Sequence, residues 1–334
     1  MQTVHWKQVS LMNCEFKSQF NICFQKFINE KKAAGYKYDT ECGILIRFDD
    51  YLFINNITAI SQDSIKNFIF ADSNRKEKTL HNIAIVINQF VLFLNKHGQD
   101  AKIYPLSMLP KEKSQYIPYI FTKKEIMKII EQASHLNPSI KDPYKNISFG
   151  LLFELLYCCG LRISEALSLK VLHIDKNKMI INIRHTKQYR DRDIPITTNL
   201  IKKIDHYIKE THKTDDMYLF SNNDQHTHYS YQKVHTVFKE ILFRCNIPYN
   251  GRDKGPNLHS LRHTFAVHSL RKQINEGKEL MSILPVLSKY MGHRSVSGTQ
   301  NYLHLTKEFF SDCITEQTRQ IIPDIEDNGD IYEK

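Results

Sequence analysis

Four residues in the last quarter of the chain are of types that bind phosphate and transfer protons. His259 and Arg262 stand three residues apart in a segment whose apolar residues have helical spacing, so both side chains should project from one face of a helix. Gly292 indicates a helix end just before His293, and a polar run then leads to Tyr302. Without a cluster of carboxylates, these residues favour a phosphate-binding site with a hydroxyl nearby. They argue against metal-assisted hydrolysis, because hard cations need oxygen ligands.

An arginine and a lysine earlier in the chain extend this set. Arg162 follows Gly160 at the turn that begins a helix, where the helix dipole favours an acid over a base. Its placement is more easily explained if Arg162 faces an anion. Lys187 lies in the turn between two expected strands and could reach outward, although lysines in such turns are usually only solvated.

The elements that must position these residues fall into several regions. In the first hundred residues apolar side chains recur at helical spacing, and we expect helices at 16–34, 39–55, 62–71 and 76–96. Prolines at 105, 110 and 118 then interrupt helix formation. We therefore divide the chain into an all-helical N-terminal domain (1–104), a linker (105–118), a catalytic domain (119–320) and an acidic C-terminal tail (321–334).

The catalytic domain mixes helices with short strands. Thr122 and Glu125 form a capping-box pattern that begins a helix ending near residue 133. Further helices are expected at 147–159, 199–212 and 230–244, and strands at 171–174, 179–185 and 191–196. The predicted fold class is therefore mainly α with a small antiparallel β-sheet (α+β).

Composition limits the class of protein. Lys and Arg number 46 against 36 Asp and Glu, giving a formal net charge of +10 that favours a polyanionic partner such as nucleic acid. At 41% hydrophobic residues, the chain is too apolar to be disordered. Because no uncharged apolar run could span a bilayer and the first residues are polar, we expect a cytoplasmic protein without membrane association. Seven cysteines without a CxxC pair fit reduced thiols better than disulfides or a zinc site.

Taken together, the motifs resemble those of the tyrosine recombinase (phage integrase) family over nearly the whole chain. The resemblance rests on the run 160–165 (GLRISE), Lys187 eight residues before Pro195, the run 259–264 (HSLRHT), and Gly292-His293 followed by Tyr302. The run 284–293 looks most like recombinases carried by transposons and other mobile elements. The family implies an all-helical, DNA-binding core-binding domain followed by a tyrosine-recombinase-like catalytic domain.

The resemblance also implies an activity, namely cutting and rejoining double-stranded DNA for integration, excision or transposition of a mobile element. Tyr302 would attack phosphorus and become linked to the 3′ phosphate, so that no cofactor is needed. The protein would assemble into a tetramer on DNA, and a segment beyond Tyr302 would pack onto a neighbouring protomer. Partner recombinases or directionality factors could take part.

The chemistry of displacement at a phosphodiester suggests roles for the other residues. Charge develops on the non-bridging oxygens, and the planar guanidinium groups of Arg162 and Arg262 suit a clamp on them. The tyrosine hydroxyl has an ordinary pKa of ~10, so His259 suits a proton acceptor. By resemblance, Lys187 would protonate the departing 5′ oxygen and His293 would hydrogen-bond a phosphate oxygen.

Several assignments remain open at this point. Glu165 would orient a catalytic neighbour rather than react, and His263 fits helix packing as well as support of the site. The N-terminal lysines could form a solvated face instead of a DNA contact. His226 and His228 fit a loop surface better than a metal site. The alternative functions are a relaxase like type IB topoisomerases, and a sequence-specific DNA-binding protein whose catalytic residues are vestigial.

Overall fold

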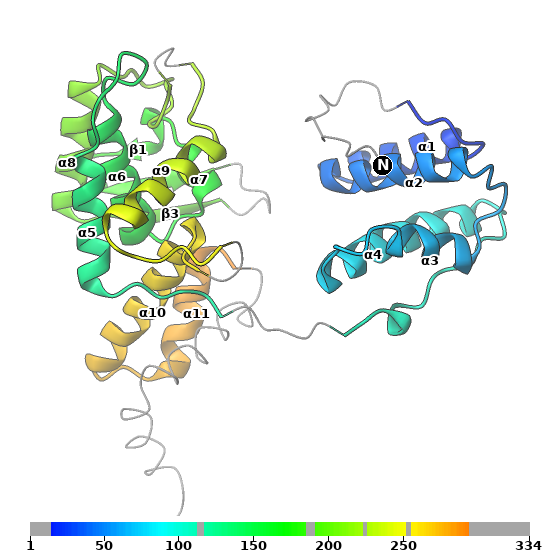
Figure 1. Cartoon of the computed structure of the whole chain (residues 1–334). Coiled ribbons are helices and arrows are strands. Elements are labelled where there is room, and N and C mark those ends of the chain that lie inside the picture. Colours follow the sequence, from blue (N-terminus) through cyan, green and yellow to red (C-terminus); the bar gives the residue numbers. More distant parts are fainter. Residues whose placement is uncertain (1–14, 112–116, 185–190, 223–225, 252–254, 294–334) are drawn as a thin grey trace, which may run out of the picture. The chain divides into compact units, whose positions relative to one another are not determined.

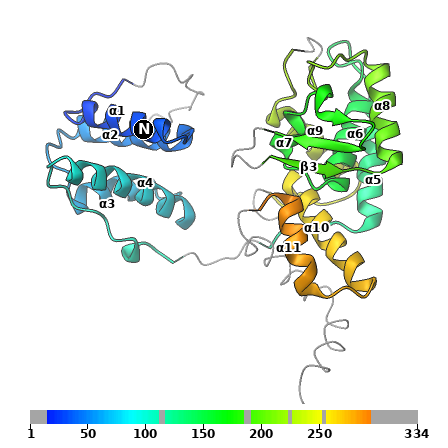
Figure 2. The same ribbon diagram turned by 180° about the vertical axis from the view of Figure 1, so that it is seen from behind.

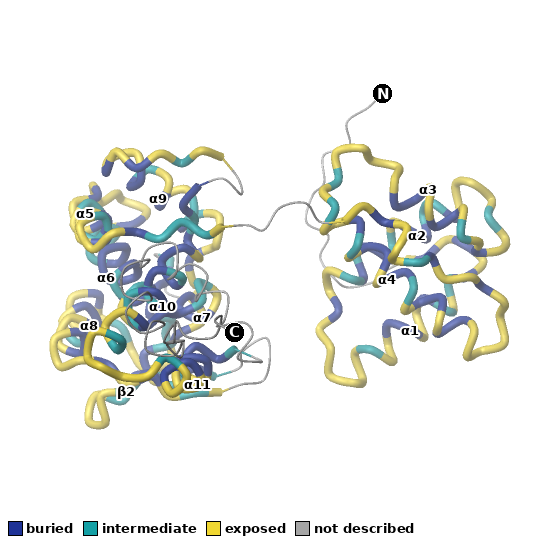
Figure 3. Tube along the Cα trace, turned by 90° about the horizontal axis from the view of Figure 1, so that it is seen from below, coloured by how far each residue is buried: buried dark blue, intermediate teal, exposed yellow. Residues whose placement is uncertain are grey.

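The computed structural model of the chain describes residues 15–111, 117–184, 191–222, 226–251 and 255–293. The chain divides into two compact units, Met1–Gln115 and Tyr116–Lys334, and each has its own buried core (Figures 1 and 3). No helix in these ranges is both long and apolar enough to cross a membrane.

The first unit is helical, as predicted. It contains α1 (Asn21–Ala33), α2 (Asp39–Ile54), α3 (Gln62–Phe70), α4 (Glu77–Lys96) and the short 3-10 helix η1 (Leu106–Met108). Helix α4 packs against the other three α-helices. At the centre, the fully buried rings of Phe24 and Phe90 stack with their centroids 3.9 Å apart. The apolar positions that predicted the helices are therefore the ones that hold them together.

Helix α1 begins at Asn21, five residues later than the sequence predicts. The preceding segment is tied instead to the buried side chain of Asp49, which accepts hydrogen bonds from the amides of Lys17 and Ser18 and from the Ser18 hydroxyl. Phe16 still joins the core through its ring. A polar side chain from a distant helix thus overrides the local helical pattern.

The second unit is built around the apolar helix α6 (Lys145–Cys158), against which α5 (Lys123–Ser134), α8 (Thr198–Glu210) and α10 (Leu258–Asn275) pack. Helix α9 (Tyr231–Arg244) packs on α5, and the short α7 (Ile163–Leu167) follows α6. Helices α10 and α11 (Leu280–Met291) lie side by side at one end of the unit (Figures 1 and 2).

The sheet is small and antiparallel, in the order β1 (Ile174–Asp175), β2 (Ile180–Ile183) and β3 (Arg192–Pro195). Ile181 pairs with Ile194, and Ile183 pairs with Arg192. This arrangement confirms the predicted mainly-α fold with a small antiparallel sheet.

The strand predicted at 171–174 is wrong. Val171–His173 forms the 3-10 helix η2, because the amides of Val171 and Leu172 donate to the carbonyls of Met217 and Asp215 rather than to a neighbouring strand. Only its last position, Ile174, enters the sheet. The apolar pattern identified burial correctly, but it does not specify which backbone groups pair.

Apolar side chains of the second unit form two clusters. The larger one joins α5, α6, α8, α9, the sheet and the first turns of α10. The smaller one joins the later part of α10 to α11, through Ala266, Val267, Leu270, Ile283, Leu284, Leu287 and Met291. Helix α11 is therefore held mainly by the smaller cluster, and its Tyr290 also packs against the larger one.

Candidate active site

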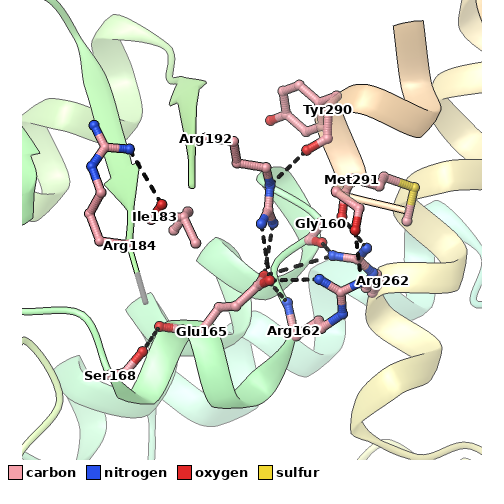
Figure 4. A network of polar contacts seen from close by, with 11 residues as sticks. Gly160, Arg162, Glu165, Ser168, Ile183, Arg184, Arg192, Arg262, Tyr290 and Met291 are labelled. Atoms are coloured by element: carbon pink, nitrogen blue, oxygen red, sulfur yellow. Dashed lines mark hydrogen bonds and ion pairs between the residues drawn. The ribbon is translucent and has the colours of Figure 1, made fainter. Parts of the chain in front are cut away.

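Three segments far apart in the sequence meet at one place. They are the turn after α6, the first turns of α10, and the end of α11, and β3 lies beside them (Figure 4). Each segment carries one of the motifs that predict phosphate chemistry.

Gly160 makes the close approach of the first segment possible. Its φ of +57° lies in the left-handed region, and a Cβ atom there would fall 2.3 Å from the ring of Phe265 on α10. A side chain would therefore be both strained and in collision. The turn passes directly against α10, and Arg162 follows as the residue that precedes α7.

The second segment is fixed by the cap of α10. The Asn257 side chain accepts hydrogen bonds from the amides of His259 and Ser260, and the Ser260 hydroxyl accepts one from the Asn257 amide. This reciprocal cap places His259 in the first turn and Arg262 one turn later. The side chain of Arg262 is only 1% exposed, so its charge needs partners within the protein.

The third segment ends at Gly292, whose φ of +66° terminates α11 in the left-handed conformation. The amides of Gly292 and His293 donate to the carbonyls of Lys289 and Ser288. The sequence indicates this stop correctly. His293 consequently leaves the helix at a defined point.

One carboxylate lies at the centre of the site. Glu165 is 5% exposed and accepts hydrogen bonds from Arg162 (Nη1 to Oε1, 2.8 Å) and from both terminal nitrogens of Arg192 (3.0 and 2.8 Å). Its Oε2 also accepts the Arg162 amide at 2.9 Å, and Nη1 of Arg262 lies 3.8 Å away. Three guanidinium groups therefore share one buried negative charge, which leaves an excess of positive charge.

The same arginines bind three consecutive carbonyls at the end of α11. Arg192 Nε donates to the Tyr290 carbonyl at 2.9 Å, Arg262 donates to that of Met291, and Arg162 donates to that of Gly292 at 3.1 Å. The last carbonyls of a helix lack partners within the helix and carry partial negative charge. The arginines thus hold the end of α11 in place (Figure 4).

The ionisation of Glu165 follows from these neighbours. Burial alone would raise its pKa, but hydrogen bonds and charge from Arg192, followed by those from Arg162, lower the pKa to about 2. Glu165 is therefore an anion at neutral pH and serves as counter-charge rather than as a proton donor.

Three histidines surround the arginines. Burial, followed by the charges of Arg262 and Arg162, lowers the pKa of both His259 and His293 to about 4. Burial and then His259 lower that of His263 to about 3, and the rings of His259 and His263 meet edge to face with centroids 4.5 Å apart. His259 is an exposed residue, so contact with water weakens the effects of both burial and charge on its pKa, which remains lowered. At neutral pH all three are neutral imidazoles, which can accept a proton.

The structure brings together six of the eight predicted site residues, namely Arg162, Glu165, His259, Arg262, His263 and His293. The other two, Lys187 and Tyr302, lie outside the described residues. Lys187 belongs to the connection between β2 and β3. Within the described ranges, no group of three His, Cys, Asp or Glu residues could hold a metal ion.

Arg192 is the residue of the site that the sequence analysis did not assign. It lies on the same face of β3 as the buried Ile194, because alternate residues of a strand point the same way, and its side chain is 10% exposed. A charged residue on the inner face of a strand was the available signal, since such a residue needs a buried partner.

Comparison with known proteins gives consistent matches. The sequence model of the phage integrase family matches residues 120–308. A tyrosine recombinase of Pseudothermotoga lettingae is 32% identical over 202 residues, which are 60% of this chain and 61% of the relative. Tyrosine recombinase XerA of Pyrococcus horikoshii is 26% identical over 266 residues, which are 78% of this chain and 82% of the relative.

Solved structures share the fold. The Tn1549 transposon integrase in complex with transposon right end DNA matches with a TM-score of 0.63 at 15% identity, over 90% of this chain and 99% of that one. The XerH site-specific recombinase bound to a palindromic difH substrate, in a post-cleavage complex, matches with a TM-score of 0.63 at 19% identity, over 83% of this chain and 78% of that one.

Proposed function

The chain belongs to the phage integrase family, and from this premise we propose that it is a site-specific recombinase that cuts and rejoins DNA through a 3′-phosphotyrosyl intermediate. One observation carries the proposal. Three guanidinium groups converge on a single buried carboxylate, and three neutral imidazoles lie close enough to these arginines to feel their charge, a site suited to an anion with several oxygens. The likeness of residues 284–293 to recombinases of mobile elements supports a role in integration, excision or transposition.

In this reaction Arg162 and Arg262 bind the non-bridging oxygens of the phosphate. Both already lie beside Glu165, so little reorganisation is needed when charge develops in the transition state. Loss of either guanidinium should cost on the order of 3 kcal/mol of transition-state stabilisation. Glu165 holds the arginines and does not itself react.

Tyr302 forms the new bond to phosphorus, and the bond from phosphorus to the 5′ oxygen breaks. His259 accepts the phenol proton, a role for which its neutral state at physiological pH is required. Lys187 donates a proton to the departing oxygen, and His293 hydrogen-bonds a phosphate oxygen. His263, packed edge to face against His259, fixes the orientation of that ring. The phosphotyrosyl bond keeps the energy for rejoining, so ATP is not consumed.

The decisive experiment is Tyr302→Phe with a nicked DNA substrate that traps the covalent adduct. We expect the adduct to disappear while DNA affinity stays nearly unchanged, because only the nucleophilic oxygen is lost. Tyr231→Phe, at an exposed tyrosine that begins α9, is the matched control and should form the adduct normally. An adduct that persists in Tyr302→Phe, or that maps to Tyr290, contradicts the assignment.

Supercoiled plasmids with and without candidate element ends distinguish the alternatives. Relaxation of every plasmid would indicate a topoisomerase-like relaxase, which would use a similar set of residues. Binding without any covalent complex would indicate a DNA-binding protein with a vestigial site.

We further propose that the first unit is the core-binding domain and that its basic residues contact phosphates. A chain that begins at Tyr116, where the second unit starts, should then bind DNA more weakly. Its affinity should also fall less steeply with salt, by about one unit of logarithmic slope per lost contact. An unchanged slope would show that the N-terminal lysines are only solvated.

Assembly into a tetramer on two DNA sites, with a segment beyond Tyr302 packed onto a neighbouring protomer, is part of the same proposal. Partner recombinases or directionality factors are further candidates. Sedimentation of the protein with a two-site DNA measures the assembly.

A further inference from the structure

The guanidinium group of Arg192 is directed at protein groups rather than at the phosphate. It contacts Glu165 and the end of α11, which position the proposed phosphate-binding residues. Its two terminal nitrogens bind the two oxygens of Glu165 at 3.0 and 2.8 Å, and its Nε binds the Tyr290 carbonyl at 2.9 Å. All three nitrogens therefore donate to groups inside the protein, and the side chain is 10% exposed. This geometry is that of a brace rather than of a ligand for DNA.

The first end of this brace determines the position of Arg162. Glu165 offers Oε1 to Arg162 Nη1 and to Arg192 Nη1, so both guanidinium groups share one oxygen. A carboxylate held at both oxygens by a planar guanidinium cannot rotate freely. Without Arg192, Glu165 would keep its bonds to Arg162 and the more distant Arg262, but no guanidinium would hold both of its oxygens in one plane.

The second end of the brace determines the end of α11. Tyr290, Met291 and Gly292 present consecutive carbonyls to Arg192, Arg262 and Arg162. A Cβ atom on Gly292 would lie only 3.1 Å from Nη1 of Arg192, so the guanidinium lies directly against the residue that precedes His293. Displacement of Arg192 would thus disturb Gly292 and, with it, the position of the next residue, His293.

From this geometry we infer that Arg192 is a positioning residue for strand cleavage: by joining Glu165 to the carbonyl end of α11, it aligns Arg162 and His293 on the same phosphate. The inference rests on the proposed function, because it concerns how that site is aligned. Lysine cannot replace Arg192, since an ammonium group is a single point charge and cannot make the two-pronged contact and the carbonyl contact together.

The test compares Arg192→Lys with wild type in single-turnover cleavage at saturating protein, with DNA affinity measured separately. We expect the cleavage rate to fall by about 10²-fold, the loss typical of a slightly misplaced reacting group, and DNA affinity to change little. Arg244→Lys is the matched control, because Arg244 pairs with Glu240 on the surface of α9, and it should cleave at the wild-type rate.

A second substrate separates alignment from a simple loss of folded protein. Replacing one non-bridging oxygen of the scissile phosphate with a methyl group makes the linkage neutral, so that less arginine charge is needed there. If Arg192 acts through Arg162, then Arg192→Lys and Arg162→Ala should both lose less activity on the neutral linkage. We expect the deficit of Arg192→Lys to shrink to within about tenfold of wild type. The ratio of rates on the two substrates does not depend on the folded fraction.

Three results would overturn the inference. They are an equal deficit of Arg192→Lys on both substrates, a wild-type cleavage rate in that variant, and a loss confined to DNA affinity. A wild-type protein that cleaves neither substrate would instead overturn the proposed function, and the inference with it. The double variant adds a further check: Arg162→Ala with Arg192→Lys should lose less activity than the two single losses combined, because part of the effect of Arg192 acts through Arg162 and the rest through the end of α11.

Discussion

Replacing Glu165 with glutamine removes one charge and keeps the size of the side chain. In the native site the carboxylate lies between Arg162 and Arg192, with Arg262 close by. Glutamine would present an NH2 group, itself a donor, to arginine nitrogens that are also donors. The change therefore leaves buried positive charge without its counter-charge, and we expect the second unit to lose stability.

The size of the loss can be worked out in two ways. The displacement of the Glu165 pKa from 4.5 to about 2 is equivalent to about 3 kcal/mol in favour of the ionised form. Removal of one partner from a buried ion pair costs roughly 3–5 kcal/mol in other proteins. Because Glu165 is only 5% exposed, screening by water reduces these values little. We therefore predict a destabilisation of about 3 kcal/mol.

Urea unfolding of the full chain, followed through hydrogen exchange of peptides from α6 and α10, reports on the unit that contains the site. Glu240→Gln is the matched control, because Glu240 is 40% exposed and pairs with Arg244 on the surface of α9, and it should lose less than about 1 kcal/mol. Sulfate or DNA should stabilise Glu165→Gln more than wild type, since an anion would restore the missing charge. If Glu165→Gln is no less stable than Glu240→Gln, Glu165 does not balance the arginines as described.

Two further predictions concern proton transfer and pH. Lys187→Ala should be slowed by about 10²- to 10⁴-fold on ordinary DNA and largely restored on a strand whose bridging 5′ oxygen is sulfur, because a thiolate leaves without a proton. Arg262→Ala should stay slow on both strands, and equal impairment of Lys187→Ala on the two would show that it is not the acid. For the histidines, a folded pKa below the unfolded value of about 6.5 means that the unfolded state binds more protons, so stability is full above pH 6.5 and falls as pH drops toward the folded values. His263→Gln should therefore show a smaller fall in melting temperature between pH 7 and pH 5 than wild type, and an equal fall would contradict the proposed neutral state of His263.

The phosphate-binding motifs could be recognised in the sequence because each consists of a few residues close together in the chain. The spacing of His259 and Arg262 places both on α10, and the glycine before His293 ends α11 where predicted. That these segments meet Arg162, a hundred residues earlier, is set by packing of α10 against α6, which helical periodicity does not reveal. Only the resemblance to a known family predicted that these segments and Arg162 belong to one site.

Arg192 shows where reading of residue patterns failed. Its partners, Glu165 and the Tyr290 carbonyl, lie 27 and 98 residues away, so no local motif contains them. The late start of α1 has a similar cause, because Asp49 captures the preceding backbone from another helix. In both cases the partner of a polar side chain is set by tertiary structure, and it cannot be predicted from the spacing of residues in the sequence.

The separate hydrophobic cluster beneath α11 bears on how this end of the molecule can move. Detaching α11 would uncover mainly a small group of side chains shared with the later part of α10, and of the main core only the side chains that Tyr290 covers. Pro285 within α11 has no amide hydrogen to donate to the preceding turn, so the helix lacks one of its own internal bonds. Segments with few buried contacts open locally at less cost than a whole domain. We therefore expect α11, which carries His293 at its end, to open at less cost than the main core, and the arginine contacts with its last three carbonyls to oppose that opening.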